Sequence, residues 1–241
     1  MNFSSSELKR RARSALTGKY GTMIGAGFLV SAISGGLSLL LTLFGDGSLS
    51  YQICFLIITF LTTILSAGLS FLTLNIARGR DVRATDVFAV FSNHPDRIII
   101  LTLLLELISI ACLLPLMLSS AFLMFSITGL FAFPKTGTLL LIAAACIVSL
   151  VLLIIVTLRY SLVYFLYFDY PSLSATELMR ESSRRMKGRK GRYFYLQISF
   201  IGMHLLAILS LGLGYLWLLP YISMAQTFFY LETFGETRSN Y

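Results

Sequence analysis

The sequence predicts an all-α integral membrane protein, a bundle of about six transmembrane helices with basic amphipathic helices on its cytoplasmic side. Mean hydropathy is +0.82, and 56% of the 241 residues are hydrophobic. Only 12% are charged, whereas a typical soluble domain has about 25%. Five long runs contain no Asp, Glu, Lys or Arg: 20–45, 47–77, 107–134, 136–158 and 193–231. A bilayer core about 30 Å thick needs roughly 20 helical residues, so each run is long enough to span.

The individual spans follow from these runs. The first resembles a secretory signal peptide because it follows basic residues, but its apolar run is too long and no clear cleavage site follows, so we expect a retained span. The run 193–231 is too long for one crossing, and Gly212, Gly214 and Pro220 interrupt it, so we expect two helices there, the second one short. The predicted spans, all in one membrane domain 1–241, are 21–44, 51–77, 98–128, 138–168, 193–217 and 219–233.

The distribution of Lys and Arg predicts the orientation. Of the nineteen cations, five lie in segment 1–19, four in the loop 78–97 and seven in the loop 180–192, and the intervening loops have almost none. Cytoplasmic loops are enriched in Lys and Arg, so both termini are expected in the cytoplasm. The third loop supplies candidate contacts for anionic lipids: Arg180, Arg184, Arg185, Lys187, Arg189, Lys190 and Arg192. A nucleic-acid partner is not expected, because no recognition motif accompanies these cations.

Two cytoplasmic segments have the signature of capped amphipathic helices. Ser4 is followed by Glu7, and Ser174 by Glu177, which is the spacing of a capping box. Gly188 is placed to end the second helix, and the segment 172–192 is expected to lie in the headgroup region. The stretches "VRATDVF" (82–88) and "LSATELM" (173–179) are weakly similar, which is compatible with either chance or parallel repeats of the kind that transporters use.

Three ionisable residues fall inside predicted spans. Glu106, Arg159 and His204 lie nine to twelve residues from the nearest flanking charge, which places them roughly 14 to 18 Å from the cytoplasmic boundary if their helices are continuous. One interpretation is a polar cavity that handles a proton or an anionic headgroup. The alternative is structural: Arg159 extends toward the interface, Glu106 pairs with it, and His204 hydrogen-bonds at a helix contact.

Sequence signatures of catalysis and of metal binding are absent. Two histidines are too few for a histidine-based metal site, and the three cysteines lie at unrelated spacings inside spans. No nucleophile elbow or Walker A motif is present, so we expect no enzyme activity and no cofactor, and an ATP-driven role would need a partner subunit. The glycines of the first span, such as Gly21 and Gly25, are expected to allow close helix packing.

The C-terminal third carries a family resemblance. "SLSATELMRESSRRMKGRKGRYFYLQISFIG", followed by "LGLGYLWLLPYISMAQTFFY", resembles an uncharacterised family of bacterial six-span membrane proteins, domain-of-unknown-function family 975. The "ARSALTGKYG" segment is similar to the family's basic opening helix, although Met203 stands where the family tends to have tryptophan. The resemblance implies a bacterial cytoplasmic membrane and supplies no established activity.

Three functional hypotheses are compatible with these features. The first is a non-enzymatic membrane protein that assists export of, or immunity to, a small peptide or lipid-like molecule, working with another membrane component or an ATPase subunit. The second is a self-contained secondary transporter or flippase, which requires Glu106, Arg159 and His204 to line one accessible cavity. The third is a membrane scaffold whose basic helices recruit a cytoplasmic partner.

Overall fold

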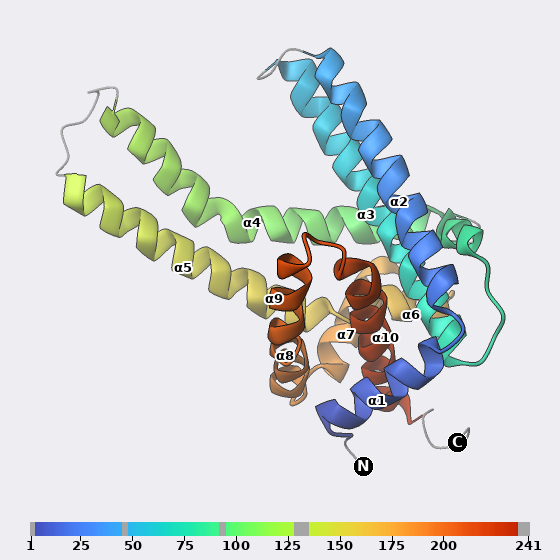
Figure 1. Ribbon diagram of the computed structural model, residues 1–241. Helices are drawn as coiled ribbons and strands as arrows, with labels where there is room; N and C mark the ends of the chain where they lie inside the picture. The colour runs from blue at the N-terminus through green and yellow to red at the C-terminus, as the bar shows by residue number, and fades with distance from the viewer. Residues whose placement is uncertain (1–2, 45–47, 92–94, 128–134, 236–241) are drawn as a thin grey trace.

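The computed structural model describes residues 3–44, 48–91, 95–127 and 135–235, and all the regular structure in these ranges is helical (Figure 1). The α-helices are α1 (Ser5–Leu16), α2 (Tyr20–Leu40), α3 (Leu49–Ala77), α4 (Pro95–Ile127), α5 (Lys135–Tyr160), α6 (Val163–Asp169), α7 (Ala175–Arg185), α8 (Lys190–Ile198), α9 (Ile201–Leu209) and α10 (Tyr215–Phe234). Two 3₁₀ segments, η1 (Leu41–Leu43) and η2 (Ala84–Phe91), complete the described structure.

Five helical stretches in the described part of the chain are long and apolar enough to cross a membrane. They are Tyr20–Leu43, Leu49–Ala77, Pro95–Met124, Gly137–Asp169 and Lys190–Leu209. The all-α membrane fold is therefore confirmed, but the expectation of six spans is wrong, because α10 does not qualify. Its run is almost free of charge but not strongly apolar, since it contains Trp217, Gln226 and several tyrosines.

Two long hairpins, α2–α3 and α4–α5, extend away from a compact base (Figure 1). Helix α4 is bent, and Pro115 inside it removes a backbone hydrogen bond and disfavours a straight helix. Between 6% and 22% of the apolar windows of α2 to α5 are buried inside the protein, which suits helices whose remaining surface faces lipid.

Helix α10 forms the centre of the base. It packs against α1, α2, α3 and α9, and its buried side chains include Met224, Phe228, Phe229 and Tyr230. From Pro220 on, α10 is mostly enclosed by protein, and an enclosed segment does not need the uniform hydropathy that lipid contact demands. The backbone N–H of Phe3 donates to the carboxylate of Glu232 at 3.1 Å. The two ends of the described chain therefore lie side by side.

The start of the chain and the α7–α8 region repeat one structure at an offset of 170 residues. Ser4 and Ser174 each accept a hydrogen bond from the glutamate N–H three residues on. Gly18 and Gly188 both have φ of +78°, a left-handed conformation that favours glycine, and each is followed by a basic N-cap residue. The buried faces also correspond, with Leu8, Ala12 and Leu16 matching Leu178, Ser182 and Met186.

The weaker similarity between 82–88 and 173–179 also has a structural counterpart. Asp86 accepts the N–H of Arg83 at 2.8 Å, as Glu177 accepts that of Ser174, but η2 is a 3₁₀ segment and α7 an α-helix. Three units follow one another along the described chain, each a short helical segment before a helical hairpin: α1 before α2–α3, η2 before α4–α5, and α7 before α8–α10.

Gly68 of α3, and not the glycines of the first span, makes the closest helix contact. A Cβ atom at Gly68 would lie 2.0 Å from the carbonyl oxygen of Val87 in η2. A Cβ at Gly21, Gly27 or Gly36 would meet no described heavy atom within 4 Å, and one at Gly25 would meet only Ala84 at 3.7 Å. The expected close packing through the first-span glycines is therefore wrong for most of them.

Candidate functional site: the basic interfacial layer

We call the base of the molecule the interfacial layer: α1, α7, and the adjoining ends of α3, α6, α8 and α10. Both amphipathic helices bury an apolar face and carry cations on the other. Such helices lie in the plane of a membrane interface. The layer therefore collects most of the cations of the sequence at the end of the molecule opposite the tips of the two long hairpins (Figure 1).

A three-residue cluster joins α3, α6 and α10 in this layer. Arg78 donates two hydrogen bonds to Asp169, at 2.6 and 2.8 Å, and the hydroxyl of Tyr230 donates to the same carboxylate at 2.6 Å. The side chains of Arg78 and Asp169 are only 23% and 14% exposed. A two-pronged pair between arginine and carboxylate fixes orientation as well as distance, so this cluster aligns the three helix ends.

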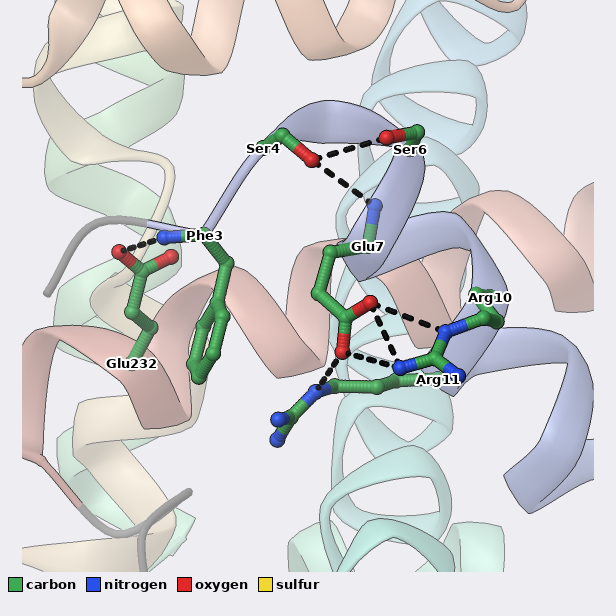
Figure 2. A network of polar contacts seen from close by, with 7 residues as sticks. All are labelled: Phe3, Ser4, Ser6, Glu7, Arg10, Arg11 and Glu232. Atoms are coloured by element: carbon green, nitrogen blue, oxygen red, sulfur yellow. Dashed lines mark hydrogen bonds and ion pairs between the residues drawn. The ribbon is translucent and has the colours of Figure 1, made fainter.

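A second cluster holds the N-terminal segment against α8 and α10. Arg192 donates to both carboxylate oxygens of Glu232 and, at 2.6 Å, to the carbonyl of Phe3. Glu232 also accepts the Phe3 N–H (Figure 2). The side chain of Glu232 is 7% exposed. A buried carboxylate needs a paired charge and further hydrogen bonds, and both are present here.

The first turn of α1 carries an ion network of its own. Glu7 accepts hydrogen bonds from the guanidinium groups of Arg10 and Arg11 at 2.8 to 3.0 Å (Figure 2). Its carboxylate thus faces these arginines and does not return to the backbone of Ser4, so the first expected capping box is half formed. The hydrogen bonds from Arg10 and then Arg11 lower the pKa of Glu7 from 4.5 to about 2. The second box, Ser174 with Glu177, is complete.

The seven cations predicted to contact lipid divide into two groups. Arg185 pairs with Glu181 at 2.6 Å and stacks on the Phe234 ring at 3.6 Å, and Arg192 is held by Glu232. These two are about a quarter exposed and are used within the protein. The other five are exposed or half-exposed, although Arg184 also pairs with Glu181 at 2.8 Å: Arg180, Arg184, Lys187, Arg189 and Lys190.

The structure gives Glu106, Arg159 and His204 separate partners. Glu106 accepts a hydrogen bond from Thr63 at 3.3 Å, Arg159 donates to Ser183 at 2.8 Å, and the His204 ring lies 5.7 Å from that of Tyr215. Within the described residues, no hydrogen bond or ion pair joins any two of the three. The depth inferred for Arg159 assumed one continuous helix to Asp169, whereas α5 ends at Tyr160 and Arg159 contacts the interfacial helix α7.

Each of the two amphipathic helices, α1 and α7, also donates a side-chain hydrogen bond at a point where a neighbouring span is interrupted. Ser182 of α7 donates to the carbonyl of Arg159, where α5 gives way to α6, and Lys9 of α1 donates to the carbonyl of Ser199, where α8 gives way to α9. A broken helix leaves carbonyl groups without their usual donors, and these side chains supply replacements. Sequence reasoning missed both contacts. The shared Ser-x-x-Glu and Gly spacing at the 170-residue offset would have marked both helices as equivalent.

No group of three or more His, Cys, Asp or Glu residues in the described ranges is arranged to hold a metal ion. Cys112 is buried, Cys54 is half-buried and Cys146 is exposed, and all three are free thiols.

The fold and the interfacial layer define a multi-pass helical membrane protein. Residues 1–235 match the family model described as "Protein of unknown function (DUF975)". The chain belongs to this family, as its C-terminal motifs had indicated. No curated protein and no solved structure matches the chain significantly.

Proposed function

We propose that this protein is a non-enzymatic, multi-pass component of a bacterial cytoplasmic membrane, with its interfacial layer and both termini in the cytoplasm. It assists export of, or immunity to, a small peptide or lipid-like molecule, together with another membrane protein or an ATPase subunit. The layer binds anionic lipid and holds the amphipathic cargo at the cytoplasmic surface.

This proposal rests on the different contacts that two groups of cations make. Arg78, Arg185 and Arg192 join different helices within the protein, whereas Arg180, Arg184 and Lys187 lie exposed on or beside α7. The first group makes the layer rigid and the second gives it a cationic outer surface. Each cation near an anionic membrane surface contributes about 1 kcal/mol to attraction, so this surface favours acidic headgroups and acidic amphiphiles.

The transporter or flippase alternative has less support. It required Glu106, Arg159 and His204 to line one cavity, and their separate partners favour structural roles for them. The scaffold alternative shares the exposed cations of α7 but needs no cargo. Identifying any ligand that stays bound to the extracted protein therefore distinguishes these hypotheses.

Native mass spectrometry of the protein, extracted gently from its own membrane, tests the proposal. We expect a stoichiometric partner chain together with bound anionic lipid or peptide. A partner without bound lipid or peptide would favour the scaffold. A lone chain with bound cargo would favour a self-contained carrier, and a lone chain without any ligand would contradict the proposal.

A further inference from the structure

A pocket of ≈ 310 Å³ lies where α7 packs against α4 and α5. Four of its residues come from one face of α7, at helical spacings of three and four positions. The lining residues are Leu104, Arg159, Tyr160, Thr176, Met179, Arg180 and Ser183. The pocket thus combines two guanidinium groups, three hydroxyl groups and apolar walls.

Both arginines retain donors for a ligand. Arg159 uses Nε for its bond to Ser183, and its two terminal nitrogens make no hydrogen bond in the described chain. Arg180 makes no hydrogen bond or ion pair there. Its charge contributes to lowering the pKa of Glu177, whose carboxylate is held mainly by Ser174 at the start of α7. Most other basic residues of the layer have a carboxylate or carbonyl partner, whereas Arg180 and the terminal nitrogens of Arg159 keep their donors for a ligand at one pocket.

We propose that this pocket binds the phosphate of an anionic phospholipid headgroup. Arg159 and Arg180 pair with the phosphate oxygens, and Thr176 and Ser183 lie beside them as hydroxyl donors. Leu104 and Met179 contact the glycerol and the first acyl carbons. This proposal rests on the proposed function, since it names one lipid-binding point within the interfacial layer.

A soluble phosphate compound would offer the same anionic group. The lipid is favoured because the pocket is formed by residues of two candidate spans together with the amphipathic helix α7, and its apolar walls come from α4 and from the buried side of α7. The planar guanidinium group of arginine matches the geometry of phosphate oxygens. A lipid whose phosphate is held this way has its acyl chains alongside α4 and α5.

The test measures phosphatidylglycerol bound to the purified full-length protein by native mass spectrometry, with phosphatidylcholine as the neutral reference lipid. Arg180→Gln is the principal variant, because Arg180 makes no hydrogen bond or ion pair in the described chain and its loss should not disturb the fold. Arg159→Gln/Arg180→Gln removes both charges. Arg184→Gln/Lys187→Gln is the matched control, since it also removes two cations from the same region but none from the pocket.

We expect Arg180→Gln to weaken phosphatidylglycerol binding about tenfold and the pocket double variant to weaken it further, with a smaller loss in the control, whose two cations belong to the outer cationic surface but not to the pocket. Unchanged binding in Arg180→Gln, or an equal loss in the control, would overturn the pocket while leaving the lipid-binding layer intact. Wild-type protein that binds no anionic lipid would contradict the proposed function as well. Displacement of the lipid by millimolar inorganic phosphate would overturn the lipid assignment in favour of a soluble phosphate compound.

Discussion

Asp169 is the residue on which three helix ends depend. It accepts two hydrogen bonds from Arg78 and one from Tyr230 while only 14% of its side chain is exposed. Asp169→Asn would leave the Arg78 guanidinium without its counter-charge, and we expect a loss of about 3 kcal/mol in the free energy of unfolding. Thermal unfolding of wild type and variant in detergent measures this loss of stability.

The matched control for this prediction is Tyr230→Phe. It removes one hydrogen bond to the same carboxylate but leaves the ion pair in place, so we expect a loss of about 1 kcal/mol. If Asp169→Asn were no more destabilising than Tyr230→Phe, the charge of Asp169 would not be what stabilises this cluster.

The lowered pKa of Glu7 predicts that its contribution to the stability of the protein depends on pH. Its pKa is lowered to about 2 in the folded protein by Arg10 and Arg11, so its contribution to stability is complete above the ordinary value of 4.5 and is lost as the pH falls toward 2. The difference in unfolding temperature between wild type and Glu7→Gln should therefore be largest above pH 4.5 and disappear near pH 2. A difference that does not change with pH would contradict this.

At the scale of elements, the contact between α3 and η2 depends on Gly68, because glycine has no side chain. A Cβ at Gly68 would overlap the backbone carbonyl of Val87, and a backbone atom cannot move aside as a flexible side chain can. We expect Gly68→Ala to cost about 3 kcal/mol. Gly27→Ala, in open space on α2, should change stability by less than about 1 kcal/mol. Equal effects of the two substitutions on thermal unfolding would show that η2 does not dock there.

The turn between α9 and α10 has the character of a segment that lies in hydrocarbon. Leu209, Leu211 and Leu213 are strongly exposed, Leu211 by 95%. The backbone N–H groups from Ser210 to Leu218 all donate hydrogen bonds within the protein, as non-aqueous surroundings require. A hairpin that enters and leaves the membrane on the same side would also account for an α10 that is less apolar than a span.

We therefore expect a cysteine at Leu211, in a chain lacking the native cysteines, to resist a membrane-impermeant maleimide from both sides. A hydrophobic maleimide should label the same position, which provides the control for reactivity. Rapid labelling by the impermeant reagent from the side opposite the termini would mean that α10 completes a sixth crossing.

At the scale of the whole molecule, the contact between Phe3 and Glu232 requires both described ends to lie on one side of the membrane. Cysteines at Ser6 and Lys187, both exposed in the interfacial layer, should react from the same side. Cysteines at Ser50 and Gly137, at the far ends of the two long hairpins, should react from the other side. Labelling of intact cells and inverted vesicles distinguishes the two sides. Ser6 and Lys187 on opposite sides would contradict this topology.

The sequence alone determined the class of this protein and the approximate bounds of four of its spans. Charge-free runs mark spans because burying a charge in lipid is costly, and Ser174 with Glu177 marks a helix start because a cap needs only neighbouring residues. These are local signals, and the four expected spans between residues 21 and 168 were each found within a few residues of their predicted bounds.

Only the tertiary structure decided which charges are free and which helix is enclosed. Phe3 and Glu232 are 229 positions apart, and no local pattern indicates that Arg192 would join them while Arg180 would line a pocket. The trio of Glu106, Arg159 and His204 had been placed by counting along unbroken helices, and the breaks after Tyr160 and Ile198 changed the geometry. A charge acquires its role from the groups that folding brings beside it, because hydrogen bonds and ion pairs act over a few ångströms whatever the separation in sequence.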